Sequence, residues 1–120
     1  MFRIAVVAAL LIASSHAPAQ AQCAVQPWSI PYLGSNTSTT MAVGSGQPCQ
    51  IYPSVGGTNA MTGISISSPA SNGTASASSD VITYQSQPGF TGQDSFTFTI
   101  TGSGPGGSGT SAVQVGVTVR

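Results

Sequence analysis

The side chains that could carry chemistry in this sequence are few and widely spaced. Beyond residue 22 they are two cysteines, Cys23 and Cys49, and two carboxylates, Asp80 and Asp94. Two carboxylates can support the acid–base chemistry of glycosidases or aspartic proteases when their environments separate their pKa values. Here Asp80 follows a serine in a sequence typical of a turn before a strand, and Asp94 opens another strand. We therefore expect structural roles for both carboxylates and no catalysis.

The N-terminus has the organisation of a secretory signal peptide. Arg3 precedes an apolar run over residues 4–13, and Ala-x-Ala cleavage choices follow at residues 17–21. A run of about ten apolar residues is typical of a signal peptide, whereas a bilayer span needs about 20. We therefore interpret residues 1–21 as a signal peptide rather than a retained anchor. The mature chain is then expected in the periplasm or outside the cell, without lipidation at Cys23.

Removal of the signal peptide leaves a chain almost without charge. It has no lysine, glutamate or histidine, and Arg120 is its only basic side chain. Histidine-dependent catalysis and activation of a serine or cysteine nucleophile therefore have no base. The usual zinc site needs three or four Cys, His or carboxylate ligands, and two cysteines and two aspartates do not form that pattern. Calcium needs six to eight oxygen ligands, and the mature chain has two carboxylates. Nucleic acid is excluded as a partner, because its affinity grows with the number of phosphates that basic residues neutralise. We expect no enzymatic activity, metal or other cofactor.

The two cysteines are expected to form a disulfide. An exported chain with an even number of cysteines normally pairs them. Closure of the loop between Cys23 and Cys49 would stabilise the fold by about 3 to 4 kcal/mol. The alternative is a reactive or metal-binding thiol pair, but no cationic neighbour is present in the sequence to lower either thiol pKa. The disulfide would anchor residues 22–40, which we interpret as an extended N-terminal arm.

Turn residues recur at short intervals, and helical periodicity is absent. Alternation is strongest over residues 94–101 and 111–119, where every second residue is apolar, and this predicts an antiparallel hairpin. The glycine-rich connection at residues 102–110 predicts a flexible spacer. Shorter strands are expected at residues 41–43, 50–52, 63–68, 73–76 and 81–84. Several short strands separated by turn residues predict an all-β sandwich or barrel.

The aromatic residues of the N-terminal arm form a second candidate site. Trp28 and Tyr32 each follow a proline, Pro27 and Pro31 respectively. In an exposed arm they could form a platform that stacks against a sugar ring. Packing of the two rings onto the sandwich is the favoured interpretation, because large aromatic side chains normally contribute to a core.

The order of the later segments resembles the bacterial Ig-like, cadherin-like domain family of surface and secreted proteins. The resemblance rests on ISISSPASNGT at 64–74, VITY at 81–84, PGFTGQDSFTFTI at 88–100 and AVQVGVTV at 112–119. It covers residues 41–120 and is most specific at residues 88–98, which we call the corner motif. It implies a Greek-key β-sandwich of about seven strands. It also implies a spacer, an adhesin segment, or a module that binds carbohydrate or protein.

The corner motif also has a physical interpretation of its own. Its two glycines permit positive φ angles, and its first phenylalanine offers an apolar plug for the end of the sandwich. Asp94 can accept hydrogen bonds from backbone amides at the junction between loop and strand. Phe98 stands where the family often has tyrosine, so a hydroxyl-mediated corner bond is expected to be missing. The predicted structural corner comprises Gly89, Phe90, Gly92, Asp94, Phe96 and Phe98.

These features predict a non-enzymatic exported module with a structural or adhesion-type binding role at the cell envelope. We expect a monomer with no membrane anchor after signal cleavage and with an envelope protein or glycan as partner, although the near-zero net charge favours self-association. One alternative is a fimbrial or fibre subunit in which residues 22–40 donate a strand to a neighbour. The other is an inhibitor of a secreted hydrolase that acts through the arm or the glycine-rich loop.

Overall fold

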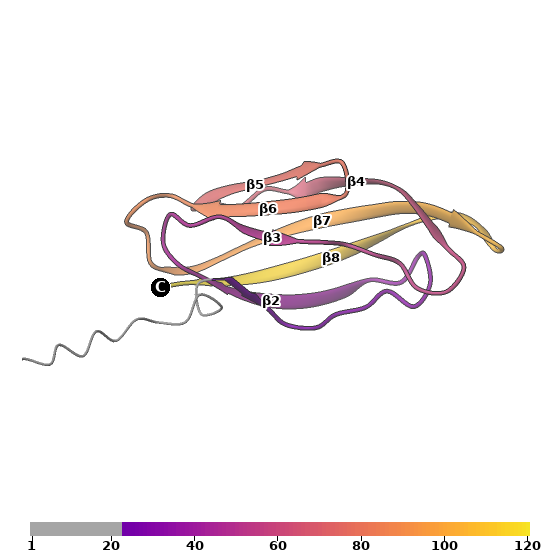
Figure 1. Cartoon of the computed structure of the whole chain (residues 1–120), viewed down its shortest axis with the longest axis horizontal. Helices are drawn as coiled ribbons and strands as arrows, with labels where there is room; N and C mark the ends of the chain where they lie inside the picture. The colour runs from indigo at the N-terminus through magenta and orange to yellow at the C-terminus, as the bar shows by residue number, and fades with distance from the viewer. Residues whose placement is uncertain (1–22) are drawn as a thin grey trace, which may run out of the picture.

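The computed structural model describes residues 23–120, so the predicted signal peptide lies outside the described residues. The described chain forms two β-sheets (Figure 1). In spatial order, the five-stranded sheet contains β1 (Cys23–Val25), β2 (Thr37–Val43), β8 (Gly107–Val119), β7 (Gly92–Gly104) and β4 (Ala60–Ser68). The three-stranded sheet contains β3 (Cys49–Ile51), β6 (Val81–Ser86) and β5 (Gly73–Ser78). The two sheets form an Ig-like β-sandwich, which confirms the predicted fold class.

The core follows from the alternation in β7 and β8. Phe96, Phe98 and Ile100 of β7 are buried, as are the four valines of β8 at positions 113, 115, 117 and 119. The intervening positions are mostly serine and threonine, which give the outer face polarity without charge. Because side chains alternate between the two faces of a strand, this pattern fixes which face of the five-stranded sheet meets the core.

The N-terminal segment differs from the expected extended arm. Strand β2 pairs in parallel with β8, from Thr37 opposite Val113 to Val43 opposite Val119. The domain boundary that we expected between residues 40 and 41 therefore falls inside β2. Ile30 is 2% exposed and belongs to the core.

Hydrogen bonds explain how this polar segment joins the sandwich. The Gln26 backbone N–H donates to the Thr40 carbonyl oxygen at 2.9 Å. In the other direction, the buried Thr39 hydroxyl donates to the Gln26 carbonyl oxygen at 2.8 Å. The prolines interrupt the alternation of the segment, but they leave these contacts in place. The segment is therefore part of the domain.

The expected flexible spacer at residues 102–110 is also corrected. Strands β7 and β8 continue through it as paired ribbon until Gly104 lies opposite Gly107, and only Pro105 and Gly106 form the turn. Figure 1 shows the tip of this hairpin projecting beyond the ends of β2, β5 and β6. Three of its glycines, Gly102, Gly104 and Gly109, permit close approach of neighbouring segments. A Cβ atom on Gly102 would collide with the Ala60 carbonyl oxygen, and one on Gly109 would lie 3.1 Å from Leu33 Cβ.

We expect Gly102→Ala to lower the free energy of unfolding by about 1 to 3 kcal/mol, because the added methyl group overpacks the contact with β4. The matched control is Gly106→Ala at the turn, where an added Cβ meets nothing within 4 Å. That variant should stay within about 0.5 kcal/mol of wild type. Urea denaturation monitored by Trp28 fluorescence measures both changes. Equal stability of the two variants would contradict the close-packing role of Gly102.

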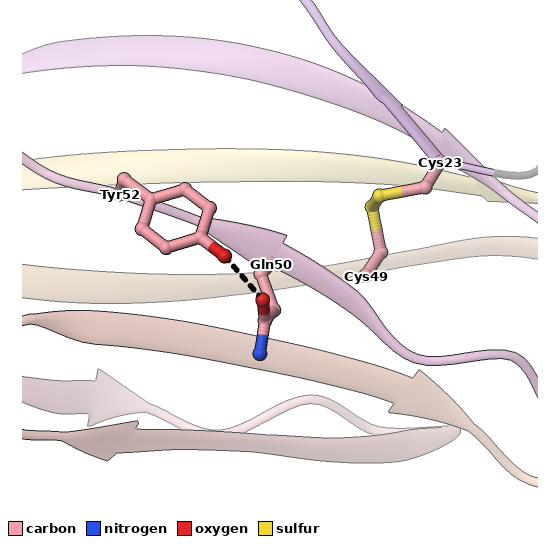
Figure 2. Close-up of a disulfide and its surroundings, with 4 residues drawn as sticks. All are labelled: Cys23, Cys49, Gln50 and Tyr52. Carbon is pink, nitrogen blue, oxygen red and sulfur yellow. Dashed lines mark hydrogen bonds between the residues drawn. A yellow bond between two sulfur atoms is a disulfide. The ribbon is translucent and has the colours of Figure 1, made fainter. Parts of the chain in front are cut away.

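The predicted disulfide between Cys23 and Cys49 is confirmed, with an S–S distance of 2.00 Å and a Cα–Cα distance of 5.3 Å. It joins β1, at the edge of the five-stranded sheet, to β3, at the edge of the three-stranded sheet (Figure 2). The sequence separation is 26 residues. The disulfide therefore fastens one side of the sandwich, where the Gly56 backbone N–H also donates to the Ile30 carbonyl oxygen and links the segments that follow β3 and β1.

Replacement of both cysteines by alanine should lower the free energy of unfolding by about 3 to 4 kcal/mol. The reason is that the unfolded chain regains the entropy of the loop that the disulfide closes. Urea denaturation of the oxidised protein and of the double variant measures the difference. Reduced wild-type protein should match the double variant, and an unchanged denaturation midpoint would show that the bridge adds no stability.

Candidate functional site

A groove of about 340 Å³ lies beside the disulfide. One wall is the segment that continues from β1, and the other is β3 with the residues that follow it. Both walls come from the outer edges of the two sheets, so the groove lies on the open side of the sandwich. Its lining residues are Val25, Gln26, Pro27, Trp28, Gln50, Ile51, Tyr52 and Ser54.

Alternation along β3 explains which side chains at this wall of the groove are exposed. Cys49, Ile51 and Pro53 are buried, whereas Gln50 and Tyr52 between them are exposed. Tyr52 is 68% exposed, which is unusual for so large an apolar side chain. Its hydroxyl donates a hydrogen bond to Gln50 Oε1, as Figure 2 shows. The exposed ring is thus attached to a strand that the disulfide anchors.

Trp28 has a different environment on the opposite wall. Its indole packs edge-on against Phe98, with 5.8 Å between ring centroids and 75° between ring planes. The side chain is half-buried and packs against the core, and this contact holds the indole in position. Trp28 therefore combines the packing role that we favoured with a place in the groove wall.

Tyr32 does not meet Trp28 in a common platform. It is 63% exposed and lies in a turn in which Ser35 bonds back to its carbonyl oxygen, but it does not line the groove. The second aromatic residue of the groove is Tyr52, which the sequence analysis missed. A signal was present in the sequence, because Gln50 and Tyr52 occupy alternate positions beside a buried cysteine and isoleucine. The alternation indicates only that Gln50 and Tyr52 are exposed. It does not indicate that Trp28 lines the same groove, because the fold brings these segments together.

The groove can bind but has no apparent acid–base machinery. Its polar side-chain groups are the amides of Gln26 and Gln50, the hydroxyls of Tyr52 and Ser54 and the indole N–H of Trp28. Among residues 23–120, no carboxylate, imidazole or amine lines it. The arrangement therefore offers aromatic surface and neutral hydrogen-bonding groups to a ligand.

The predicted corner forms a second polar site, around Asp94. Asp94 Oδ1 accepts hydrogen bonds from the backbone N–H groups of Ser71 at 3.0 Å and Ser95 at 2.9 Å. Its Oδ2 accepts from the Asn72 N–H at 3.0 Å and from the Tyr84 hydroxyl at 2.8 Å. The carboxylate is 9% exposed, so all four donors bind a buried charge. This satisfied carboxylate joins β7, β6 and the loop before β5.

The hydroxyl in the corner comes from Tyr84, which the sequence analysis did not single out. Phe98, at the position where the resemblance implied a tyrosine, is fully buried, whereas Tyr84 reaches Asp94 from β6 in the opposite sheet. The Tyr84 ring stacks on Phe96, with 5.7 Å between centroids. The hydroxyl-mediated bond that we expected to be missing is therefore present, with a different donor.

The remaining corner residues shape the turn before β7. Gly89 has φ +84° and Gly92 has φ +135°, values that side-chain-bearing residues rarely adopt. Phe90 is half-buried and packs against the core. These residues bring the chain into β7 in the position that places Asp94 beside Tyr84.

Asp80 lies far from Asp94. It is exposed in the turn between β5 and β6, next to the pair Ser78–Val81, whereas Asp94 binds the backbone just before Gly73 at the opposite end of β5. Five residues of strand separate these ends by about 16 Å, well beyond the separation of paired catalytic carboxylates in glycosidases. Within residues 23–120, no group of three Cys, His, Asp or Glu side chains could hold a metal ion.

The hydrogen bonds and burial at the corner favour a charged Asp94 beside a neutral Tyr84. Burial alone raises the pKa of Asp94, but the hydrogen bonds from Tyr84, Ser71, Ser95 and Asn72 outweigh it and hold the pKa below its ordinary value. Burial, followed by the hydrogen bond to Asp94 and the negative charge of that residue, raises the pKa of Tyr84 above its ordinary value.

These shifts predict the direction of the pH dependence. Because the pKa of Asp94 is lower in the folded state, its contribution to stability is present above pH about 4 and is lost as the pH falls through the folded value. Chemical denaturation between neutral pH and pH about 2 should show this loss. Tyr84→Phe removes one hydrogen bond that lowers the pKa, so it should cost about 1 to 3 kcal/mol at neutral pH and show a smaller acid loss. Identical acid profiles would contradict the coupling.

Comparison with known proteins agrees with this geometry. The family model of the bacterial Ig domain matches residues 30–116, which include the corner, all of β2 to β7 and most of β8. The match begins inside the segment that we expected to be an arm, consistent with its inclusion in the sandwich. No curated protein matches the chain. Within residues 23–120, no helix is long and apolar enough to cross a membrane. By its sequence match and its two-sheet sandwich, the chain belongs to the bacterial Ig domain family.

Proposed function

We propose that the protein is an exported, non-enzymatic Ig module with an adhesion-type binding role at the cell envelope. The observation that carries this proposal is the groove beside the disulfide, where a 68% exposed tyrosine and a tryptophan line an uncharged recess. A module that served only as a spacer would need no such recess. Exposed aromatic residues with neutral hydrogen-bonding groups are typical of recognition surfaces.

Export is supported by two independent features. The N-terminal sequence has the organisation of a secretory signal, and the disulfide requires an oxidising compartment to form and persist. Members of the bacterial Ig domain family typically occur in surface and exported proteins, which agrees with this destination. The periplasm or the cell exterior is therefore the proposed site of action.

The sheet order favours a self-contained module over a strand-donating fibre subunit. Strand β8 pairs with β7 on one side and with β2 on the other, so it completes the five-stranded sheet from within the chain. Donor-strand assembly needs an unfilled position in the sheet. The N-terminal segment, which was the candidate donor, contributes β1 and part of β2 to its own sandwich.

Fractionation of bacterial cells that produce the full chain tests the proposal. We expect the protein in the envelope fraction or the medium, with both thiols oxidised and the chain monomeric on dilution. A matched chain that lacks residues 2–21 should remain in the cytoplasm with reduced thiols. Retention of the full chain in the cytoplasm would overturn export, and ordered fibres that persist on dilution would favour strand-donating assembly instead. Potent inhibition of a secreted hydrolase by the purified protein would favour the inhibitor alternative.

A further inference from the structure

We propose that the groove between Trp28 and Tyr52 is a binding site for a neutral glycan chain, an inference that rests on the proposed binding role and specifies its ligand. Tyr52 supplies the exposed ring on which a sugar stacks. Gln26 and Gln50 supply amides for its hydroxyl groups, and Trp28 forms the fixed wall.

The size and chemistry of the groove match a sugar. Its volume of about 340 Å³ is within the range of about 300 to 1,000 Å³ that is usual for ligand pockets. A pyranose ring has an apolar C–H face and a rim of hydroxyl groups, so it needs both an aromatic surface and groups that donate and accept hydrogen bonds. Side-chain amides do both. Gln50 accepts from Tyr52 through Oε1 and still carries two N–H donors on Nε2.

The absence of charge in the lining argues against ionic ligands. The charged side chains of the described residues are Asp80 and Asp94 on the β5–β6 turn and the corner, and Arg120 after β8, and none of them lines the groove. A phosphate, carboxylate or amine that entered the groove would lose hydration without gaining an ionic partner. A neutral, hydroxyl-rich ligand loses less hydration free energy and can recover it from the amides and hydroxyls.

An added peptide strand is the other occupant that a groove between sheet edges could accept. Here β1 and β3 are only three residues long, and Pro27 and Pro53, which lack the N–H that a β-ladder needs, follow them. Short edges next to prolines are a feature that discourages strand addition. The backbone therefore favours recognition through side chains, and the side chains favour a sugar.

The walls are ordered before any ligand binds. The disulfide holds β1 to β3, and Trp28 packs against the fully buried Phe98. Figure 2 shows the Tyr52 hydroxyl directed toward the Gln50 amide on the same strand as the bridge. Binding to an ordered groove costs little conformational entropy, which helps weak stacking and hydrogen-bonding contacts to give measurable affinity.

The chain contains one tryptophan, and it lies in the groove wall, so its fluorescence reports directly on occupancy. The test is a titration of the oxidised mature protein with cellohexaose, maltohexaose, xylohexaose and chitohexaose. We expect a saturable change in Trp28 fluorescence with at least one of them. Tyr52→Ala should weaken that binding by about tenfold or more, because it removes the stacking surface.

Tyr32→Ala is the matched control, because Tyr32 is 63% exposed and lies outside the groove. It should bind like wild type, and both variants should keep the wild-type melting temperature. Since Tyr52 projects into solvent, its truncation should leave folding intact. Gln50→Ala should weaken binding as well, by loss of an amide contact.

Three outcomes would overturn the inference. The first is the absence of a saturable Trp28 response to all four hexasaccharides at millimolar concentration. The second is equal weakening by Tyr52→Ala and Tyr32→Ala. The third is a Tyr52-dependent response to a synthetic peptide with the sequence of residues 111–119 and none to the sugars, which would assign the groove to strand addition. Export to the envelope without any sugar response would leave the proposed envelope role standing and reject only the glycan site.

Discussion

The carboxylate of Asp94 is the interaction on which the assembly of the two sheets depends most directly. It is a buried charge in a domain that has almost no other charged groups, so its four hydrogen bonds must form together with the fold. They connect β7 of one sheet with Tyr84 of the other and with the backbone before β5. A shift of one sheet against the other would break the bond to Tyr84 and leave the charge without one of its donors.

Along the strands of the sandwich, apolar side chains face the core and mostly uncharged polar side chains face outward. The inward positions of β7 and β8 are phenylalanine, isoleucine and valine, whereas the outward positions are largely serine, threonine, glutamine and glycine. Cross-strand pairs on the outer face bond to one another, as Ser65 does with Thr99 at 2.9 Å. Such a surface offers little long-range electrostatic attraction, so recognition must depend on shape and short-range contacts, as the groove provides.

The sequence predicted those parts of the molecule in which local pattern and global structure agree. Regular alternation located β7 and β8, and the export signal with paired cysteines predicted the disulfide. Strand β1 was missed because it lies just before Pro27 and Pro31, in a segment without alternation that we interpreted as an extended arm. The ribbon beyond Thr101 was missed because composition cannot distinguish a glycine that makes room for Leu33 from one that gives flexibility. The placement of Trp28 and Tyr52 in one groove and the hydrogen bond from Tyr84 to Asp94 bring together distant segments, which only the folded chain displays.

The bridge between Cys23 and Cys49 also determines how the domain would transmit a mechanical force. Tension applied at Cys23 passes through the sulfur atoms directly into β3, because the covalent path through the disulfide is shorter than the path along the chain. Residues 24–48 are therefore bypassed, and they include β2 and the groove wall that carries Trp28. Residues 23–49 form a closed covalent loop, so tension between the two ends of the domain could separate the wall that carries Trp28 from β3 only within the reach of that loop.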